Sequence, residues 1–382
     1  MDPVHAIAVL ATIYVSATFA GSITAILINT PGTSAAAATT FDGYPLAQKG
    51  EAGRALGIAV ISSTVGGVFS VIILCFAAPL LARVAYEFRS PEYFALTVFG
   101  LSMLASISAG GAVKNLIGGI FGVWLSTIGA ERVTGIERFM FGNYELYEGI
   151  HFVPIFIGLF AISELLVQSK TVNKIVNTVS MKAVKLPTKE DYKKIWKTIL
   201  RSCGIGTFIG VLPAEGATVA SMIGYSEARR WSKNKEEFGK GSIEGIAGAE
   251  AANNSATGGA MVPTMVLGIP GSGTTAIILV GLMVHGLRPG VYLFTEQVEK
   301  VYQIFGSMFF ANIMFMLMGL YAAKIFARVS LVPTAILWPI VFGLSVIGAY
   351  AFQGQLLDVW LALIFGVIGF FARRHGFSVA PI

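Results

Sequence analysis

Two Pro-Gly pairs interrupt the two longest uncharged stretches of the chain. Pro31-Gly32 lies within the 39 residues of 3–41, and Pro270-Gly271 lies within the 37 residues of 251–287; neither stretch contains Asp, Glu, Lys or Arg. One bilayer crossing needs only about 20 apolar residues, so each stretch is too long for a single span. Proline removes a backbone N–H and glycine lets the chain turn freely. We therefore predict a helix, a break inside the membrane and a second helix in each stretch.

The residues around these breaks are of the types that hold an anion. A helix N-terminus behaves like roughly half a positive charge, and half-helices that begin near Thr33 and Ser272 would hold a carboxylate-rich substrate if both faced one cavity. Paired Gly/Pro-interrupted segments in two halves of a membrane protein also point to a transporter's binding site. The predicted substrate-binding residues are Asn29, Thr30, Pro31, Gly32, Thr33, Ser34, Asn253, Asn254, Pro270, Gly271, Ser272, Gly273 and Thr274. The alternatives are hydroxyls that only cap helices and kinks that serve only packing.

Polar residues inside the second uncharged stretch suggest a cation site. Asn253, Asn254 and Ser255 lie in a segment expected to be a membrane-embedded helix, where polar side chains are costly unless they are satisfied. Their oxygens suit a hard cation such as Na⁺; the alternative is hydrogen bonding between helices. Glu244 and Glu250, near the expected cytoplasmic end of this helix, are interpreted as a solvated or salt-bridged face; the alternative is a proton relay.

The composition indicates a polytopic membrane protein. The chain has 382 residues, of which 55% are hydrophobic and 13% charged, whereas a soluble domain has about 25% charged residues. The net charge of +6 comes from basic residues between hydrophobic runs, as in cytoplasmic loops, and does not indicate nucleic acid binding. The sequence has no P-loop, no HExxH and no CxxC, so an enzyme is not expected and no cofactor is predicted. Cys75 and Cys203 are expected to be buried, without a disulfide.

The distribution of charge divides the chain. We predict an all-α fold of two inverted-repeat halves with discontinuous and re-entrant helices and about nine or ten membrane segments: residues 1–169, a basic cytoplasmic linker at 170–201, and residues 202–382. Basic residues flank 203–224 on both sides, so this piece is predicted to be a re-entrant hairpin with its tip near Pro213; the alternative is a single span. Glu215 at that tip is a proton site, a cation ligand or merely hydrated. The residues Asp42-Gly43-Tyr44-Pro45 are expected to form a turn.

Two runs carry a family resemblance. Residues 21–57 (GSITAILINTPGTSAAAATTFDGYPLAQKGEAGRALG) and 238–290, which include AEAANNSATGGAMVPTMVLGIPGSGTTA, closely resemble the large membrane subunit of the tripartite tricarboxylate transporters. The resemblance implies a multi-pass permease of the bacterial inner membrane, driven by a Na⁺ or H⁺ gradient. It also implies three partners: a small membrane subunit, a periplasmic solute-binding protein and a carboxylate substrate such as citrate. The positions that match the family's motifs are Asn29 to Thr33, Asn253, Asn254, and Pro270 to Ser272.

Two departures from the family pattern affect this expectation. The family usually has a further span and a Gly/Pro-rich hairpin before the position of Met1 and more sequence after Ile382, so the chain resembles a permease truncated at both ends. The family hairpin typically reads Pro-Gly-x-Gly, whereas this chain has Pro213-Ala214-Glu215-Gly216. Glu215 adds negative charge where an anion would bind, which favours a less charged or proton-coupled substrate. The alternative functions are a passive anion channel and an inactive fragment of such a permease.

Overall fold

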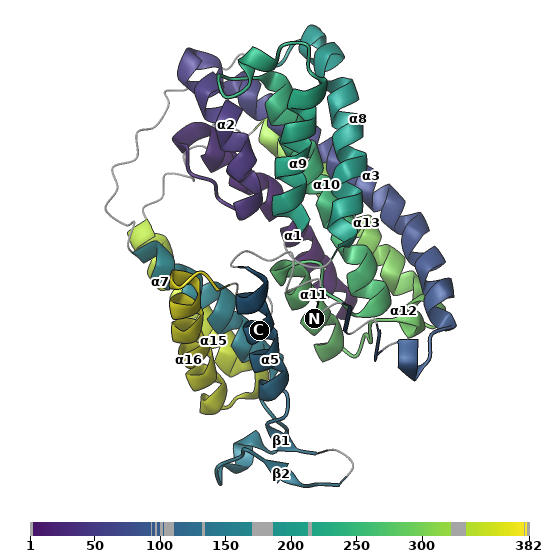
Figure 1. Ribbon diagram of the computed structural model, residues 1–382, viewed down its shortest axis with the longest axis vertical. Helices are drawn as coiled ribbons and strands as arrows, with labels where there is room; N and C mark the ends of the chain where they lie inside the picture. Colours follow the sequence, from purple (N-terminus) through teal and green to yellow (C-terminus); the bar gives the residue numbers. More distant parts are fainter. Residues whose placement is uncertain are drawn as a thin grey trace. The chain divides into compact units, whose positions relative to one another are not determined.

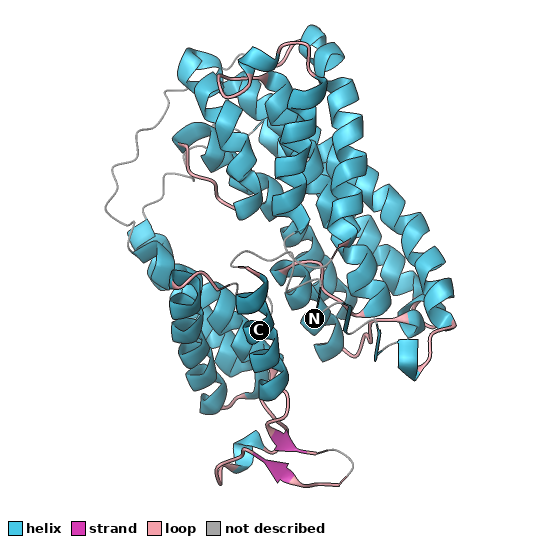
Figure 2. Ribbon diagram, viewed as in Figure 1, coloured by secondary structure: helices cyan, strands magenta, loops and turns pink. Residues whose placement is uncertain are grey.

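The fold is helical almost throughout (Figure 2). The computed structural model describes residues 3–92, 94–95, 98–99, 102, 111–131, 134–169, 186–212, 216–321, 334–377 and 379. In these ranges the β structure is one antiparallel pair of two-residue strands, β1 (Gly129–Ala130) and β2 (Glu137–Arg138). The predicted all-α class of a polytopic membrane protein is confirmed.

The described elements form two compact units, one of residues 1–89 with 175–331 and one of residues 90–174 with 332–382 (Figure 1). The first unit contains α1 (Pro3–Ile28), η1 (Ser34–Ala36), α2 (Ala37–Leu46), η2 (Ala47–Glu51), α3 (Ala52–Tyr86), α8 (Lys189–Val211), α9 (Gly216–Trp231), η6 (Lys235–Glu237), α10 (Ile243–Leu267), α11 (Gly273–Val284), α12 (Val291–Thr295) and α13 (Val298–Tyr321). The second contains α5 (Ala112–Leu125), β1, β2, η3 (Tyr144–Leu146), α6 (Phe152–Phe156), η4 (Ile157–Ile162), α7 (Ser163–Gln168), α15 (Thr334–Gln353) and α16 (Leu356–Arg374). The predicted halves, residues 1–169 and 202–382, are structural repeats along the sequence and need not coincide with these compact units. The repeat itself stays a prediction.

Four helices in the described part of the chain are long and apolar enough to cross a membrane. They are Pro3–Ile28, the continuous run Ser34–Tyr86, Val298–Tyr321 and Leu356–Arg374. Shorter apolar helices lie at Ala112–Leu125, Phe152–Val167, Gly273–Val284 and Trp338–Gln353. Helix α10 is not in this set, because its polar residues lower its mean hydropathy. It is buried inside the protein instead.

Helix α10 is the centre of the first unit, because small residues let its neighbours approach closely. Nearly every residue of α10 is buried, and the helix packs against α1, α2, α3, α8, α9 and α11. A Cβ on Gly210 of α8 would lie 2.8 Å from the Cα of Ala256, and a Cβ on Gly258 of α10 would lie 2.5 Å from the hydroxyl of Ser70. Such small-residue contacts are typical of helix packing in membranes. The polar residues of α10 therefore face protein and not lipid.

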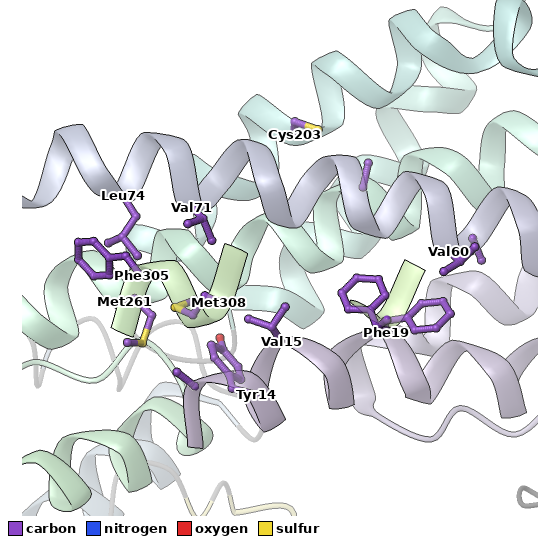
Figure 3. Packing of buried hydrophobic residues seen from close by; sticks show 14 of the residues in the cluster. Tyr14, Val15, Phe19, Val60, Val71, Leu74, Cys203, Met261, Phe305 and Met308 are labelled. Atoms are coloured by element: carbon purple, nitrogen blue, oxygen red, sulfur yellow. The ribbon is translucent and has the colours of Figure 1, made fainter. Parts of the chain in front are cut away.

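The apolar core of this unit joins helices from both ends of the sequence. Figure 3 shows side chains of α1, α3, α8, α10 and α13 in one cluster: Tyr14, Val15, Phe19, Val60, Val71, Leu74, Cys203, Met261, Phe305 and Met308. Phe19 stacks on Phe315 with ring centroids 5.0 Å apart. Cys203 is buried, as predicted, whereas Cys75 is only half-buried, and both are free thiols in the structure.

The predicted turn at 42–45 and the predicted hairpin at 203–224 have different outcomes. The helix α2 continues through Asp42 to Leu46, so the predicted turn at 42–45 is wrong, and the chain instead turns at Gly50, whose φ is +84°. Tertiary contacts extend the helix, because Asp42 is fully buried and Gly43 packs against Ile26 of α1. The predicted re-entrant hairpin at 203–224 does contain a helix break, because α8 ends at Val211 and α9 starts at Gly216; its return within the membrane stays a prediction. A Cβ on Gly216 would lie 3.2 Å from the Cα of Gly210, so these two helices form a tight hairpin; its predicted tip at Pro213 and Glu215 lies outside the described residues.

The second unit is built around α16. A Cβ on Gly158 would lie 2.7 Å from the Cβ of Phe365, and one on Gly369 would lie 2.9 Å from the Cβ of Ser163. This close contact involves the π-helical turn η4, and the Arg373 guanidinium bonds the Glu164 carboxylate at 2.6 Å at the end of the same interface.

Candidate binding site at the helix breaks

The first break follows α1 directly. The helix ends at Ile28, and Asn29 takes a positive φ of 53°, which turns the chain out of the helix. The loop then folds back onto α1, where the Gly32 N–H donates to the Gly21 carbonyl at 3.0 Å. Thr33 ends the loop as an N-cap whose hydroxyl accepts the Ala36 N–H at 3.3 Å, and η1 runs straight into α2. The predicted break at Pro31-Gly32 is confirmed.

The second break has the same parts. Helix α10 ends at Leu267, and Gly268 takes the left-handed conformation with φ of 69°. The Gly271 N–H donates to the Thr264 hydroxyl at 3.4 Å, and a Cβ on Gly271 would lie 2.8 Å from the Cβ of Ala260. Ser272 is the N-cap of α11 and forms a capping box with Thr275. The predicted break at Pro270-Gly271 is therefore confirmed as well.

The two Pro-Gly pairs lie 239 residues apart, and equivalent positions around them have similar contacts. Gly32 packs on Gly21 as Gly271 packs on Ala260, and in both cases the partner lies eleven residues earlier on the preceding helix. Thr33 and Ser272 occupy equivalent N-cap positions. The two Pro-Gly breaks thus share one local construction, in which the loop packs against a small residue of the helix that precedes it.

Both breaks also meet α1. Gly32 contacts Gly21, and the Tyr14 hydroxyl lies within hydrogen-bonding reach of Ser272. Tyr14 and Gly21 are seven positions apart on α1, which is about 10 Å along the helix axis. The N-terminal ends of the two half-helices therefore approach the same helix near one another.

The exposure of these residues differs along each loop. Residues 29–32, Ser34 and Thr274 are exposed, Thr33, Pro270, Ser272 and Gly273 are half-buried, and Gly271 is buried. The hydroxyls of Thr33 and Ser272 do cap their helices, as the alternative interpretation expected. Capping uses one N–H of each first turn and leaves the other first-turn N–H groups for a ligand.

A third element joins the first break. The Ser34 hydroxyl lies 2.9 Å from the hydroxyl of Thr218, which is in the first turn of α9. The α8–α9 hairpin therefore ends beside this break. Sequence reasoning missed Thr218, since nothing in its spacing relates it to residue 34.

The predicted cation ligands lie on two faces of α10. Asn253 donates to the Thr18 carbonyl of α1 at 3.4 Å, and Asn254 donates to the Ser63 carbonyl of α3 at 3.0 Å. Both side-chain carbonyl oxygens are buried without a hydrogen-bond partner. Ser255 instead faces α8, where a Cβ on Gly206 would clash with its hydroxyl. The structure thus brings Asn253 and Asn254 together with α1 and α3 and places Ser255 elsewhere.

Glu250 lies in the same buried region, contrary to the expectation of a solvated or salt-bridged face. Its side chain is completely buried. The carboxylate accepts hydrogen bonds from Ser22 of α1 at 2.5 Å, from Ser63 of α3 at 2.7 Å and from Thr39 of α2. Sequence reasoning judged Glu250 by its place near the expected cytoplasmic end of the helix, whereas the packing of four helices decides its surroundings. Glu244, by contrast, is half-buried and accepts a hydrogen bond from Ser232 at 2.5 Å.

Asp42 is a second buried acidic residue, and sequence reasoning did not consider its side chain. Its Oδ1 accepts the N–H groups of Gly241 and Ser242, each at 2.8 Å. These groups lie at the start of α10, so Asp42 of α2 fixes the end of the central helix.

Comparison with known proteins identifies the family. The chain matches the Tripartite tricarboxylate transporter TctA family over residues 1–382. The chain belongs to this family. A protein of Agrobacterium vitis described as an "Uncharacterized 52.8 kDa protein in TAR-I ttuC' 3'region" is 37% identical over 383 residues, which cover 100% of this chain and 76% of the relative. A second, the "Uncharacterized protein in TAR-II ttuC' 3'region" of the same organism, is 33% identical over 177 residues, 46% of this chain and 73% of the relative. No solved structure matches. The resemblance to the large membrane subunit is thereby confirmed.

Proposed function

We propose that the chain is the permease subunit of a binding-protein-dependent secondary transporter that imports an organic carboxylate, a tricarboxylate such as citrate or a related acid. Membership of the tripartite tricarboxylate transporter family supports the transport role. The observation that carries the substrate class is the matched pair of N-capped half-helices after Pro31-Gly32 and Pro270-Gly271. Two helix N-termini provide N–H donors and partial positive charge for carboxylate groups.

The substrate would be held at these breaks without a basic side chain. A carboxylate at the start of α11 would accept N–H groups from Gly273 and Thr274, and one at the start of η1 would accept from Ser34 and its neighbours. The Ser34 and Thr274 side chains are exposed and so are available to a ligand. Because each loop is pinned by a close glycine contact, the donors are held in place before the substrate arrives, which lowers the entropy cost of binding.

Transport would proceed by alternating access and be coupled to a Na⁺ or H⁺ gradient. The buried oxygens of Asn253 and Asn254 are the candidates for the coupling site. In the tripartite arrangement the permease works in the bacterial inner membrane with a small membrane subunit, and a periplasmic solute-binding protein delivers the substrate. Membership of the family supports these partners and this location.

Uptake into proteoliposomes tests this proposal. The full chain is reconstituted with its small membrane subunit, and radiolabelled citrate, other tricarboxylates and dicarboxylates are added with the loaded binding protein. We expect accumulation above the outside concentration only when an inward Na⁺ or H⁺ gradient is imposed. Equilibration that needs neither gradient nor binding protein would establish the passive anion channel instead.

A further inference from the structure

The Glu250 carboxylate is fully buried at the junction of α1, α2, α3 and α10. Three hydroxyls, of Ser22, Thr39 and Ser63, donate to its two oxygens. None of the described lysines or arginines forms an ion pair with it. Hydroxyl donors stabilise a negative charge without neutralising it, and an isolated charge in a membrane interior is costly. The site therefore calls for a positive charge.

The same region has more hydrogen-bond acceptors than donors. The amide of Asn254 donates to both the Ser63 carbonyl and, at 3.1 Å, the Oδ1 of Asn312, while Asn312 donates to the Met308 carbonyl at 2.8 Å. Because the amide nitrogen of Asn254 faces acceptors, its nitrogen and oxygen cannot exchange places. The same is true of Asn253, whose amide nitrogen faces the Thr18 carbonyl. The Oδ1 atoms of Asn253 and Asn254 are thus fixed, buried carbonyl oxygens without a donor. A proton on Glu250 would satisfy one acceptor, whereas a cation satisfies several oxygens at once.

The spacing on α10 brings these oxygens toward one another. Glu250, Asn253 and Asn254 are related as i, i+3 and i+4, so Glu250 lies between the two asparagines on the helix surface and one turn below them. Helix side chains tilt toward the N-terminus, which directs both asparagines back over the turn of Glu250. Contacts agree with this, because Asn254 and Glu250 both bond Ser63, and Asn253 and Glu250 bond residues one turn apart on α1, Thr18 and Ser22.

We propose that Glu250, Asn253 and Asn254 form a binding site for a monovalent alkali cation, with Na⁺ as its ligand. All the donor atoms are oxygens, which hard cations prefer. The single carboxylate sets the charge, since one Na⁺ neutralises it and a divalent ion would leave an excess positive charge in the membrane interior. That this site couples cation movement to transport rests on the proposed function. That it binds a cation rests only on the geometry of α10 and its neighbours.

The test measures Na⁺ binding without transport. The full chain is purified in detergent in choline chloride, and its thermal unfolding is followed as Na⁺ replaces choline at constant ionic strength. A ligand that binds only the folded state raises the unfolding temperature with its concentration. We expect Na⁺ to raise it saturably and K⁺ to do so only at higher concentration. The Glu250→Gln variant keeps an oxygen for the three hydroxyls and loses the charge, so its apparent Na⁺ affinity should fall by about tenfold or more, which corresponds to about 1.4 kcal/mol.

Glu244→Gln is the matched control, because it removes a carboxylate from the same helix, six residues closer to its start. It should leave the Na⁺ response unchanged. If Glu250→Gln does not fold, Asn253→Ala and Asn254→Ala are tested in the same titration, and each should weaken Na⁺ binding. The inference is overturned if Na⁺ and choline act alike on the wild-type chain, if Glu250→Gln retains the full Na⁺ response, or if pH alone changes stability in a way that this variant abolishes. Because no substrate is present, a failure here leaves the proposed carboxylate transport to its own uptake assay.

Discussion

Gly32 packs directly on Gly21, eleven residues back along the chain, so that a Cβ on Gly32 would lie 2.8 Å from the Gly21 Cα. That contact is closer than side chains tolerate, and it is repeated where Gly271 meets Ala260. Each loop after a helix break is thereby clamped to the helix that precedes it. The clamps hold the N-caps Thr33 and Ser272 in place, and with them the N–H groups proposed to bind the carboxylate.

A substitution that forces either loop away from its preceding helix should therefore impair transport more than folding. Gly32→Ala, and separately the double change Pro270→Ala with Gly271→Ala, should reduce carboxylate uptake strongly, by about 100-fold if the bound geometry shifts by an ångström. Membrane insertion and yield should persist. Gly306→Ala is the control, because nothing lies within 4 Å of a Cβ at that position of α13. Retained uptake in both clamp variants would count against the site.

The N-cap of α11 gives a separate prediction. Ser272→Ala removes the acceptor of the Thr275 N–H and half of a capping box, which costs about 1 kcal/mol of stability. We expect the substrate concentration for half-maximal uptake to rise, since the first turn of α11 is then less ordered. Ser272→Thr keeps a capping hydroxyl and should behave like the wild type. Equal uptake kinetics in Ser272→Ala would show that this cap has no part in substrate binding.

The buried amide of Asn254 should affect the coupling ion. Asn254→Ala removes an oxygen proposed to bind the cation and a donor to two acceptors, Ser63 and Asn312. The Na⁺ concentration for half-maximal uptake should rise by about tenfold, as measured by uptake at graded Na⁺ and pH. Thr257→Val, a buried polar change one turn further along α10, serves as the control. A merely structural role would lower the maximal rate and leave the Na⁺ dependence unchanged.

An ion pair outside the binding region should make stability depend on pH. Arg54 of α3 bonds both carboxylate oxygens of Asp191, in the first turn of α8, at 2.5 and 3.0 Å. Burial raises the pKa of Asp191, but the Arg54 guanidinium and the Thr188 N–H outweigh burial and hold that pKa below its ordinary value. The unfolded chain thus binds the proton more readily than the folded protein. The stabilisation is fully present above about pH 4, near the pKa of a free Asp, and is lost as pH falls through the lower pKa of the folded protein.

Removing this carboxylate should lower stability at neutral pH and flatten its fall in acid. Asp191→Asn should cost about 1.5–3 kcal/mol, the value of a hydrogen bond to a charged group, as measured by the unfolding temperature of the purified chain between pH 3 and 7. Glu190→Gln, an exposed neighbour, should change neither quantity. An unchanged pH profile in Asp191→Asn would contradict the role of the pair.

The sequence was sufficient to predict both helix breaks, because they depend on local rules. Proline and glycine act on their own backbone, and Thr33 and Ser272 cap helices through bonds to residues three positions later. The all-α class likewise follows from composition and from the lengths of uncharged runs. The start and end of α10 at Ile243 and Leu267 follow from the same rules.

The surroundings of Glu250 and Asp42 could not be predicted in this way, since they depend on contacts about 200 residues apart. The three hydroxyls around Glu250 come from α1, α2 and α3, and the N–H groups on Asp42 come from the start of α10. The one available signal was the i, i+3, i+4 spacing of Glu250 with Asn253 and Asn254, which places them on one helix face. Its place near the expected cytoplasmic end of the helix assigned Glu250 to a solvated or salt-bridged face, although α10 is surrounded by other helices.

Protection of introduced cysteines by substrate tests the central claim most directly. Ser34→Cys and Thr274→Cys, both exposed in the structure, are made separately with Cys75 and Cys203 replaced by serine, and the full chain is placed in nanodiscs so that both faces are accessible. The rate of reaction with a maleimide is measured with and without saturating carboxylate, with Lys235→Cys, exposed between α9 and α10, as the control. The account predicts that the transported carboxylate slows the reaction at both breaks and not at residue 235. Unchanged rates at residues 34 and 274, in protein that transports the same carboxylate, would contradict it.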